Sequence, residues 1–195
     1  MPSTLVKTRK LQIQETAERM FCEKGYSGTS IRHLAAQLQI EPASLYSHIK
    51  NKEDLLKNTC FRMAEAFFEA FHALDHTQDS AIEKLQNHIK AHIQILLQNP
   101  EASTVFFKDW IFLSEPHLAQ FKQLRKKYEV LFLQLLTEGI VQNTFRVDDL
   151  EFTIQTLFSA MNMTLSWPRH KNNWTATIIA EKLTDILLTG ILKTK

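Results

Sequence analysis

The chain has few of the residues that interrupt secondary structure. Its 195 residues include only 4 glycines and 5 prolines, which is sparse for a sheet protein with many turns. No stretch shows a strong strand-like alternation of apolar and polar residues, and no internal repeat of fixed period is present. Together with the 44% of hydrophobic residues, these absences favour an all-α protein.

Long apolar runs and a cysteine framework are also missing. No run reaches the roughly 18 to 20 residues that a membrane-spanning helix needs, and the N-terminal MPSTLVKTRK lacks the apolar segment of a secretory signal. Cys22 and Cys60 lie among apolar residues in helical patterns, so we expect buried, reduced thiols. These features predict a cytoplasmic protein with no membrane partner.

The motifs of common enzymes and metal sites are absent as well. The sequence contains no P-loop, no GxSxG elbow and no Cys/His zinc spacing. The pairs His72/His76 and His88/His92 share helix faces, but each would need further ligands to hold a metal. Glu69 and His72 form one Glu-x-x-His unit without the second copy that a di-iron bundle requires. We therefore expect no catalytic residue, no metal and no cofactor, and we interpret the histidines as exposed or hydrogen-bonded.

The net charge of +2 conceals an asymmetry along the chain. Residues 1–57 contain 9 Lys and Arg against 6 Asp and Glu, whereas residues 58–195 contain 14 against 15. This N-terminal excess of positive charge is modest, and it favours a nucleic-acid partner for the first part of the chain.

Apolar spacing and helix-end signals predict about nine helices. Gly25 is expected to end the first helix, Thr29 to cap the second, Asn51 to cap the fourth, and Ser80 with Glu83 to form a capping box on the fifth. The expected bounds are about 5–24, 30–37, 42–49, 51–74, 80–97, 103–112, 115–140, 148–167 and 173–192.

Residues 29–49 are interpreted as two short helices joined by a turn. If the apolar residues between Ile31 and Ile49 face inward, helical geometry directs small and hydrogen-bonding side chains outward. Small residues at the start of the second helix permit close approach to base edges in the major groove, while hydroxyl, imidazole and lysine groups can hold phosphates. The pattern is typical of a recognition helix.

The stretch GYSGTSIRHLAAQLQIEPASLYSHIKNKEDLL, preceded by AERMFCEKGY, resembles the DNA-binding region of the TetR family of transcriptional regulators. The resemblance covers about residues 8–57. It implies an all-α fold, with an N-terminal three-helix bundle and helix-turn-helix in residues 1–52 and a larger ligand-binding and dimerisation bundle in residues 53–195. Gln39 and Ala43 stand where the family often has glycine. A left-handed conformation at Gln39 would cost roughly 1 kcal/mol.

The resemblance assigns roles to residues of this region. Thr29 and Ser30 match the start of the family's second helix, where a phosphate is often met. Four positions match frequent DNA contacts, mostly to phosphates, and three match variable positions that can read bases. With Lys50, whose charge lies at the far end of the recognition helix, the expected DNA-binding residues are Thr29, Ser30, Pro42, Ala43, Ser44, Tyr46, Ser47, His48, Lys50 and Lys52.

The resemblance also implies a homodimer on a two-fold DNA operator. Helices at roughly 149–167 and 174–192 are the expected dimer elements, although they could also be buried within one monomer. A hydrophobic or amphipathic small-molecule effector is expected, and MNMTLSWPRHKNNW weakly resembles the corresponding part of members that respond to acyl-CoA-type ligands. The expected effector-binding residues, which could equally be ordinary core, are Phe67, Phe71, Phe106, Phe107, Trp110, Tyr128 and Met161.

The sequence therefore predicts a ligand-responsive, DNA-binding transcriptional regulator, which we expect to act as a repressor. The alternative is an all-α enzyme or small-molecule carrier that does not bind DNA. A gel shift with the DNA upstream of the protein's own coding sequence would separate the two.

Overall fold

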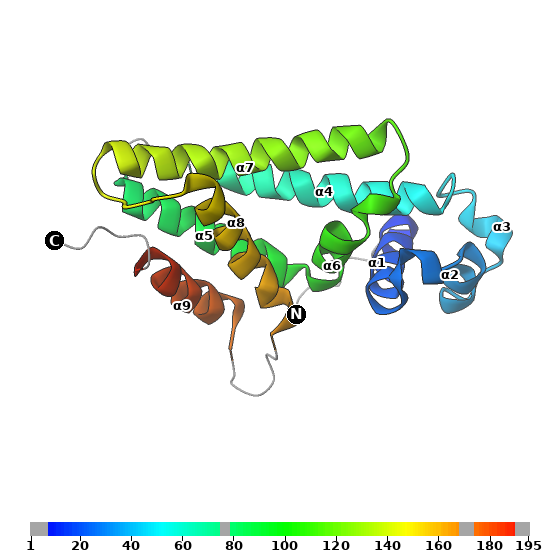
Figure 1. Ribbon diagram of the computed structural model, residues 1–195. Coiled ribbons are helices and arrows are strands. Elements are labelled where there is room, and N and C mark those ends of the chain that lie inside the picture. The colour runs from blue at the N-terminus through cyan, green and yellow to red at the C-terminus, as the bar shows by residue number, and fades with distance from the viewer. Residues whose placement is uncertain (1–7, 75–78, 168–173, 190–195) are drawn as a thin grey trace. The chain divides into compact units, whose positions relative to one another are not determined.

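The structure is a computed structural model that describes residues 8–74, 79–167 and 174–189, and these contain nine α-helices and two short 3₁₀ helices (Figure 1). The all-α prediction is confirmed. The helices are α1 (Arg9–Gly28), α2 (Ile31–Gln37), α3 (Pro42–Leu45), α4 (Lys52–Ala73), α5 (Ala81–Gln98), α6 (Pro100–Lys108), η1 (Trp110–Phe112), α7 (His117–Val141), α8 (Leu150–Met163), η2 (Thr164–Ser166) and α9 (Ala176–Thr189).

The described residues form two compact units. Unit 1 contains those of residues 1–63 and 101–121, and unit 2 contains those of residues 64–100 and 122–195. The division falls inside α4 and inside α7, so each of these long helices contributes residues to both units. The predicted boundary between a DNA-binding domain (1–52) and a ligand-binding domain (53–195) is a division by function, which compactness does not test, and it stays a prediction.

Several helix ends follow the predicted signals. Gly25, the predicted end of the first helix, adopts a φ of 75° and interrupts α1, although α1 continues beyond it to Gly28; this conformation suits glycine because it has no Cβ. The Asn51 side chain accepts a hydrogen bond from the Asp54 amide at 2.9 Å and so caps α4. Ser80 and Glu83 form the predicted capping box on α5, with both reciprocal bonds present.

Other boundaries differ from the prediction. The helix predicted at 42–49 is α-helical only over Pro42–Leu45 and continues as turns. The helix predicted at about 103–112 is α6, Pro100–Lys108, and it begins at a proline because the fixed φ of proline suits a first helical turn. Helix α8 ends at Met163 and passes into η2. The predicted end near residue 192 lies outside the described residues.

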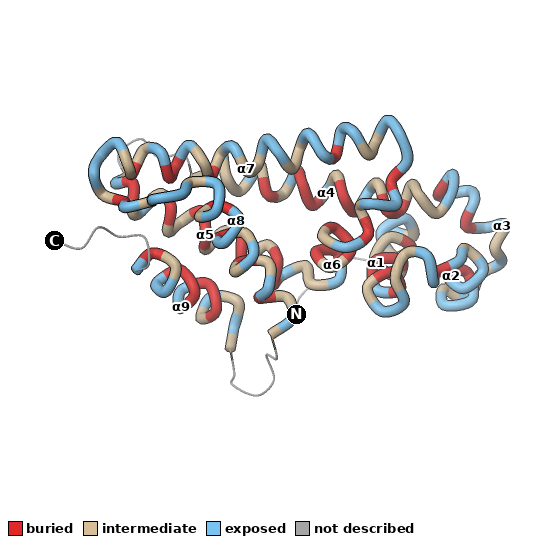
Figure 2. The backbone as a smooth tube through the Cα atoms, viewed as in Figure 1, coloured by how far each residue is buried: buried red, intermediate tan, exposed pale blue. Residues whose placement is uncertain are grey.

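The core of unit 2 is built around α5. Its apolar residues at helical spacing, including Leu85, Ile89 and Ile93, are fully buried, and α8 and α9 pack against it. Figure 2 shows buried and exposed residues alternating along α8 and α9. One side of each of these helices therefore joins the core and the other side remains open.

Candidate nucleic-acid interface and effector site

The turn between α2 and α3 has the left-handed residue that the sequence suggests. Gln39 has a φ of 55°, and the Ile40 amide donates to the Ala35 carbonyl at 3.1 Å. Because a side chain in this conformation is strained, glycine would be easier to accommodate. The turn nevertheless closes, with Leu34 and Ala35 buried beneath it.

The predicted capping role of Thr29 is wrong, and Ser30 performs it instead. The Ser30 side chain accepts a hydrogen bond from the His33 amide at 3.1 Å. Thr29 is buried, and its hydroxyl donates to the carbonyls of Met20 and Gly25 at 3.2 and 3.1 Å. Ser30 is therefore the member of this pair that reaches the surface, while Thr29 secures the junction of α1 and α2.

Helix α3 and the turns that follow it, to Lys50, present polar side chains to solvent because two apolar residues anchor this segment. Leu45 and Ile49 are buried, and the amides of His48 and Ile49 both donate to the Leu45 carbonyl. The Ser47 hydroxyl donates to the Ser44 carbonyl at 2.7 Å. Pro42 is half-buried, and the predicted DNA-binding residues that lie exposed together are Ala43, Ser44, Tyr46, Ser47, His48 and Lys50.

Lys52 lies differently from the other predicted DNA-binding residues. Its ammonium donates to the carbonyls of Tyr26 and Thr29, each at 2.9 Å, and lies 4.0 Å from the centre of the Tyr26 ring. Partial burial lowers the pKa of Lys52. Since an ammonium has three N–H groups, only one remains for a phosphate.

A buried polar network joins α1 to the start of α4. Glu18 is 6% exposed, and one of its carboxylate oxygens accepts hydrogen bonds from Gln14, Thr59 and Arg62 at 2.7 to 3.0 Å. A buried carboxylate is tolerated only when it is paired and hydrogen-bonded. This network fixes α1, against which α2 packs, to α4.

Two candidate contacts were not predicted from the sequence. Arg32 and His33 are exposed in the first turn of α2, close along the chain to the exposed cap Ser30. The signal that could have found them is the helical periodicity, which places Arg32 opposite the buried Leu34 and His33 opposite the buried Ala35.

The predicted effector residues are divided between the two units. Phe106, Phe107 and Trp110 belong to unit 1, where Phe106 and Trp110 contact the buried Phe121 with ring centres 5.2 and 6.0 Å apart. Phe106 also makes an edge contact with Phe107. Phe67, Phe71, Tyr128 and Met161 belong to unit 2.

In unit 2, aromatic rings from α4 stack on histidines of α5. Phe71 lies 3.9 Å from His88, and Phe67 lies 4.7 Å from His92, both in stacked geometry. Tyr128 of α7 contacts both phenylalanine rings, in agreement with the adjacent course of the second half of α4 and α7 in Figure 1. The stacking explains why α4, α5 and α7 meet here.

A buried hydrogen-bonded chain crosses this aromatic cluster. His92 Nδ1 lies 3.2 Å from the Tyr128 hydroxyl, and His92 Nε2 lies 3.1 Å from Asn162 Oδ1. A neutral ring satisfies both contacts if Nε2–H donates to Asn162 and Nδ1 accepts from Tyr128. Burial lowers the pKa of His92 to about 4 and raises that of Tyr128, so both groups are neutral near pH 7.

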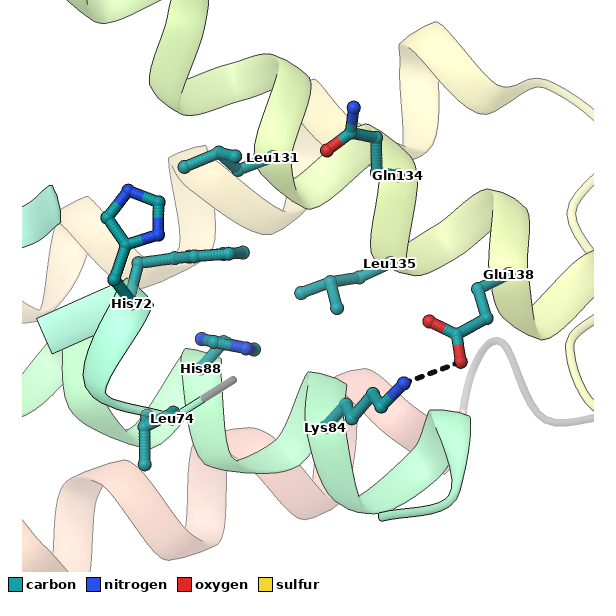
Figure 3. Close-up of a pocket in the computed structure, with 9 residues that line it drawn as sticks. His72, Leu74, Lys84, His88, Leu131, Gln134, Leu135 and Glu138 are labelled. Carbon is teal, nitrogen blue, oxygen red and sulfur yellow. Dashed lines mark hydrogen bonds and ion pairs between the residues drawn. The ribbon is translucent and has the colours of Figure 1, made fainter. Parts of the chain in front are cut away.

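A small open groove lies beside this cluster in unit 2 (Figure 3). Its volume is about 210 Å³, below the usual range for drug-sized ligands. Lys84 of α5 and Glu138 of α7 point toward each other at one end and form an ion pair of 2.7 Å. The remaining lining residues are Phe71, His72, Leu74, His88, Leu131, Gln134 and Leu135.

The structure also places the residues weighed for metal binding and disulfides. His72 is exposed, His88 and His92 are buried, and His76 lies outside the described residues. Across residues 8–74, 79–167 and 174–189, no three His, Cys, Asp or Glu side chains gather where they could hold a metal. Cys60 is buried and Cys22 half-buried, without a disulfide between them. None of the described helices is both long and apolar enough to cross a bilayer.

Comparisons with known proteins agree with this arrangement. The chain is 24% identical over 191 residues to the HTH-type transcriptional repressor KstR2 of Mycobacterium tuberculosis, covering 96% of this chain and 95% of that protein. It is 23% identical over 184 residues to the fatty acid metabolism regulator protein of Bacillus subtilis, covering 93% and 94%.

Solved structures share the fold. The structure of the ketosteroid transcriptional regulator KstR2 of Mycobacterium tuberculosis superposes with a TM-score of 0.90 at 22% identity, covering 97% of each chain. The structure of AibR in complex with isovaleryl coenzyme A and operator DNA superposes with a TM-score of 0.81 at 23% identity, covering 93% of this chain and 98% of that one.

Two family descriptions together span most of the chain. Residues 13–59 match "Bacterial regulatory proteins, tetR family", and residues 78–191 match "Tetracyclin repressor-like, C-terminal domain". The first match contains the helix-turn-helix, and the second contains the His92 network and the groove-lining residues from Lys84 to Glu138. The chain therefore belongs to the TetR family of bacterial transcriptional regulators.

Proposed function

We propose that the protein is a one-component repressor that binds a near-palindromic operator as a homodimer and leaves it when a small effector occupies unit 2. The observation that carries this proposal is the exposed polar surface of residues 43–50, formed by α3 and the turns that follow it and held outward by the buried Leu45 and Ile49. A surface of small and hydrogen-bonding side chains on a short helix and the turns after it suits base edges and phosphates.

On this proposal the exposed residues divide into two roles. Ala43, Ser44 and Ser47 read bases, because they are short enough to let the helix approach the floor of the groove. Tyr46, His48 and Lys50 bind phosphates, and Ser30 with Arg32 extends the phosphate contacts along the start of α2. Pro42 sets the beginning of α3.

The dimer is proposed to form through the open faces of α8 and α9. Phe152 is 71% exposed and Ile186 is 70% exposed, and Phe152, Thr156, Ser159 and Met163 recur at helical spacing on one exposed side of α8. Apolar side chains of this size are stabilised when a partner covers them. A two-fold operator requires the same symmetry in the protein.

The effector is proposed to bind in the aromatic cluster of unit 2, near Phe67, Phe71, Tyr128 and Met161. A cluster that is apolar except for a few directed polar groups suits a hydrophobic or amphipathic molecule. An acyl-CoA-type effector is favoured because AibR was solved with isovaleryl coenzyme A and operator DNA. Helix α4, which contributes to both units, is proposed to carry the change, provided that the effector prefers the arrangement that does not bind DNA.

The test is binding to DNA duplexes selected from a random library with the wild-type chain. We expect near-palindromic duplexes to be selected and to be released by an acyl-CoA. Sedimentation should show a dimer that Phe152→Glu dissociates. The matched control is Val141→Glu, at an apolar residue that is 80% exposed on α7. Failure to select any duplex would favour the alternative of a helical enzyme or carrier.

A further inference from the structure

The segment that joins α6 to α7 belongs to the same compact unit as the helix-turn-helix. Residues 101–121 are part of unit 1, although the C-terminal family description covers residues 78–191. Within this segment, residues 109–114 contain η1 (Trp110–Phe112) and the start of the extended connection to α7. The contacts of this short segment with the helix-turn-helix are specific and span more than 50 positions of sequence.

The first contact is made by Tyr26, which follows the interruption of α1 at Gly25. The Tyr26 ring stacks on Phe112, with centres 5.4 Å apart and planes at 25°. The Tyr26 backbone also interacts with the carboxylate of Asp109 and so opposes the burial that raises the pKa of this residue, which is only 8% exposed. Asp109 and Phe112, the two ends of this turn, therefore both interact with Tyr26 at the junction of α1 and α2.

The second contact is made by Glu53 in the first turn of α4. One Glu53 carboxylate oxygen accepts from the Ser114 amide at 2.8 Å and from the Ser114 hydroxyl at 2.6 Å. These two bonds hold the pKa of Glu53 below its ordinary value. A carboxylate that accepts two hydrogen bonds from one residue fixes both the distance and the direction of that residue.

Lys52 connects the two contacts to the reading surface, which is the set of exposed residues at Ser30 and around α3 that are proposed to contact DNA. Its ammonium binds the carbonyls of Tyr26 and Thr29, and Thr29 immediately precedes Ser30, the cap of α2. Because α2 packs against both α1 and α3, a displacement at this junction changes the direction in which α3 faces.

We propose that these residues form a clasp by which the 109–114 segment positions α2 and α3 for DNA, so that operator affinity depends on residues that do not reach the operator. The clasp consists of Tyr26, Lys52, Glu53, Asp109, Phe112 and Ser114. The inference rests on the proposed DNA-binding function. If opening the clasp lowers the fraction of molecules in the binding arrangement, the apparent affinity falls by that fraction.

The chain offers a matched pair of substitutions to test the clasp. Phe112 and Ile111 are neighbours in η1, both apolar and both exposed, at 43% and 57%, but the ring of Phe112 stacks on Tyr26. Affinity for a duplex selected with the wild-type chain is measured over a range of salt concentrations. We expect Phe112→Ala to weaken binding by up to about tenfold, the upper size of one aromatic pair, and Ile111→Ala to bind like wild type.

Two further readouts separate positioning from general destabilisation. The salt dependence of DNA binding by Phe112→Ala should equal that of wild type, since no phosphate contact is removed. Phe112→Tyr should bind DNA with wild-type affinity because a tyrosine ring can keep the stack. If Phe112→Ala does not fold, Ser114→Ala takes its place. This variant removes the hydroxyl hydrogen bond to Glu53, and we expect it to weaken binding in the same way. The clasp is refuted if wild type binds and these variants bind equally well. Absence of wild-type binding would instead refute the proposed function.

Discussion

In unit 1 the helix-turn-helix directs its hydroxyl, imidazole and ammonium groups outward, whereas unit 2 encloses an imidazole, a phenol and an amide among aromatic rings. His48 is exposed just after α3 in unit 1, and His92 is 2% exposed in unit 2. A histidine side chain therefore serves a different purpose in each unit. Outward groups can be presented to a polyanion, and enclosed groups can only be used by a ligand that enters the core or by the fold itself.

The largest expected effect comes from removing the anchor of the outward face. Leu45→Ala should lower the free energy of unfolding by about 2–5 kcal/mol, because a fully buried leucine leaves a cavity. Ser44→Ala, one position earlier and exposed, should change it by less than about 0.5 kcal/mol while altering the DNA sequences that are preferred. Denaturant titration measures both. Equal losses would mean that α3 is not anchored as described.

The enclosed histidine makes stability depend on pH. The pKa of His92 is about 4 in the folded protein and near 6.5 when unfolded, so the unfolded chain binds the proton more tightly. The stability contributed by neutral His92 is complete above about pH 6.5 and is lost as pH falls toward 4. Between pH 7.5 and pH 5 the loss should be about 2 kcal/mol, measured by denaturant titration at each pH.

Two histidine variants isolate that contribution. His92→Gln should remove this part of the pH dependence, while His72→Gln, at an exposed position on α4, should retain it. A wild-type pH profile in His92→Gln would show that other groups, such as the neighbouring buried His88, are responsible.

The cap at the edge of the reading surface should have an intermediate effect. Ser30→Ala removes the acceptor for the His33 amide and is expected to cost about 1 kcal/mol, whereas Ser30→Gly should cost only a few tenths. Thermal unfolding of the two variants provides the measurement. Identical losses from Ala and Gly would argue that the hydroxyl has another role than capping.

The smallest effect on stability is expected at Lys50. Because its side chain is exposed, Lys50→Met should leave the unfolding free energy within about 0.5 kcal/mol. It should reduce the slope of log affinity against log salt by about 0.9, the value of one lost phosphate contact. Lys126→Met, at an exposed position in unit 2, is the control and should leave the slope unchanged.

The contrast between the units also explains what could be predicted from sequence. The helix-turn-helix was predictable because its caps, turn and apolar spacing are local. Asn51 and Gly25 behave as their residue types suggest, whereas Gln39 is left-handed because of its position in the turn and not because of its residue type. The choice between Thr29 and Ser30 as cap depended on which hydroxyl the packing of α1 would bury. That choice depends on tertiary packing, and the prediction of Thr29 as the cap was wrong.

Long-range contacts were beyond local patterns. The bond from His92 to Asn162 spans 70 positions and that from Ser114 to Glu53 spans 61. Nothing in the spacing of these residues indicates that they meet. For the same reason, the sequence grouped Phe106, Phe107 and Trp110 with Phe67 and Phe71, although the two sets belong to different compact units.

The central claim is that the exposed face around α3 contacts DNA while unit 2 does not. Hydrogen–deuterium exchange of the wild-type chain, with and without a duplex selected by binding, tests it most directly. We expect the duplex to slow exchange at residues 30–33 and 42–50 and to leave the amides of α5 unchanged. Slower exchange confined to unit 2, or no change at residues 42–50 in the bound state, would contradict the account.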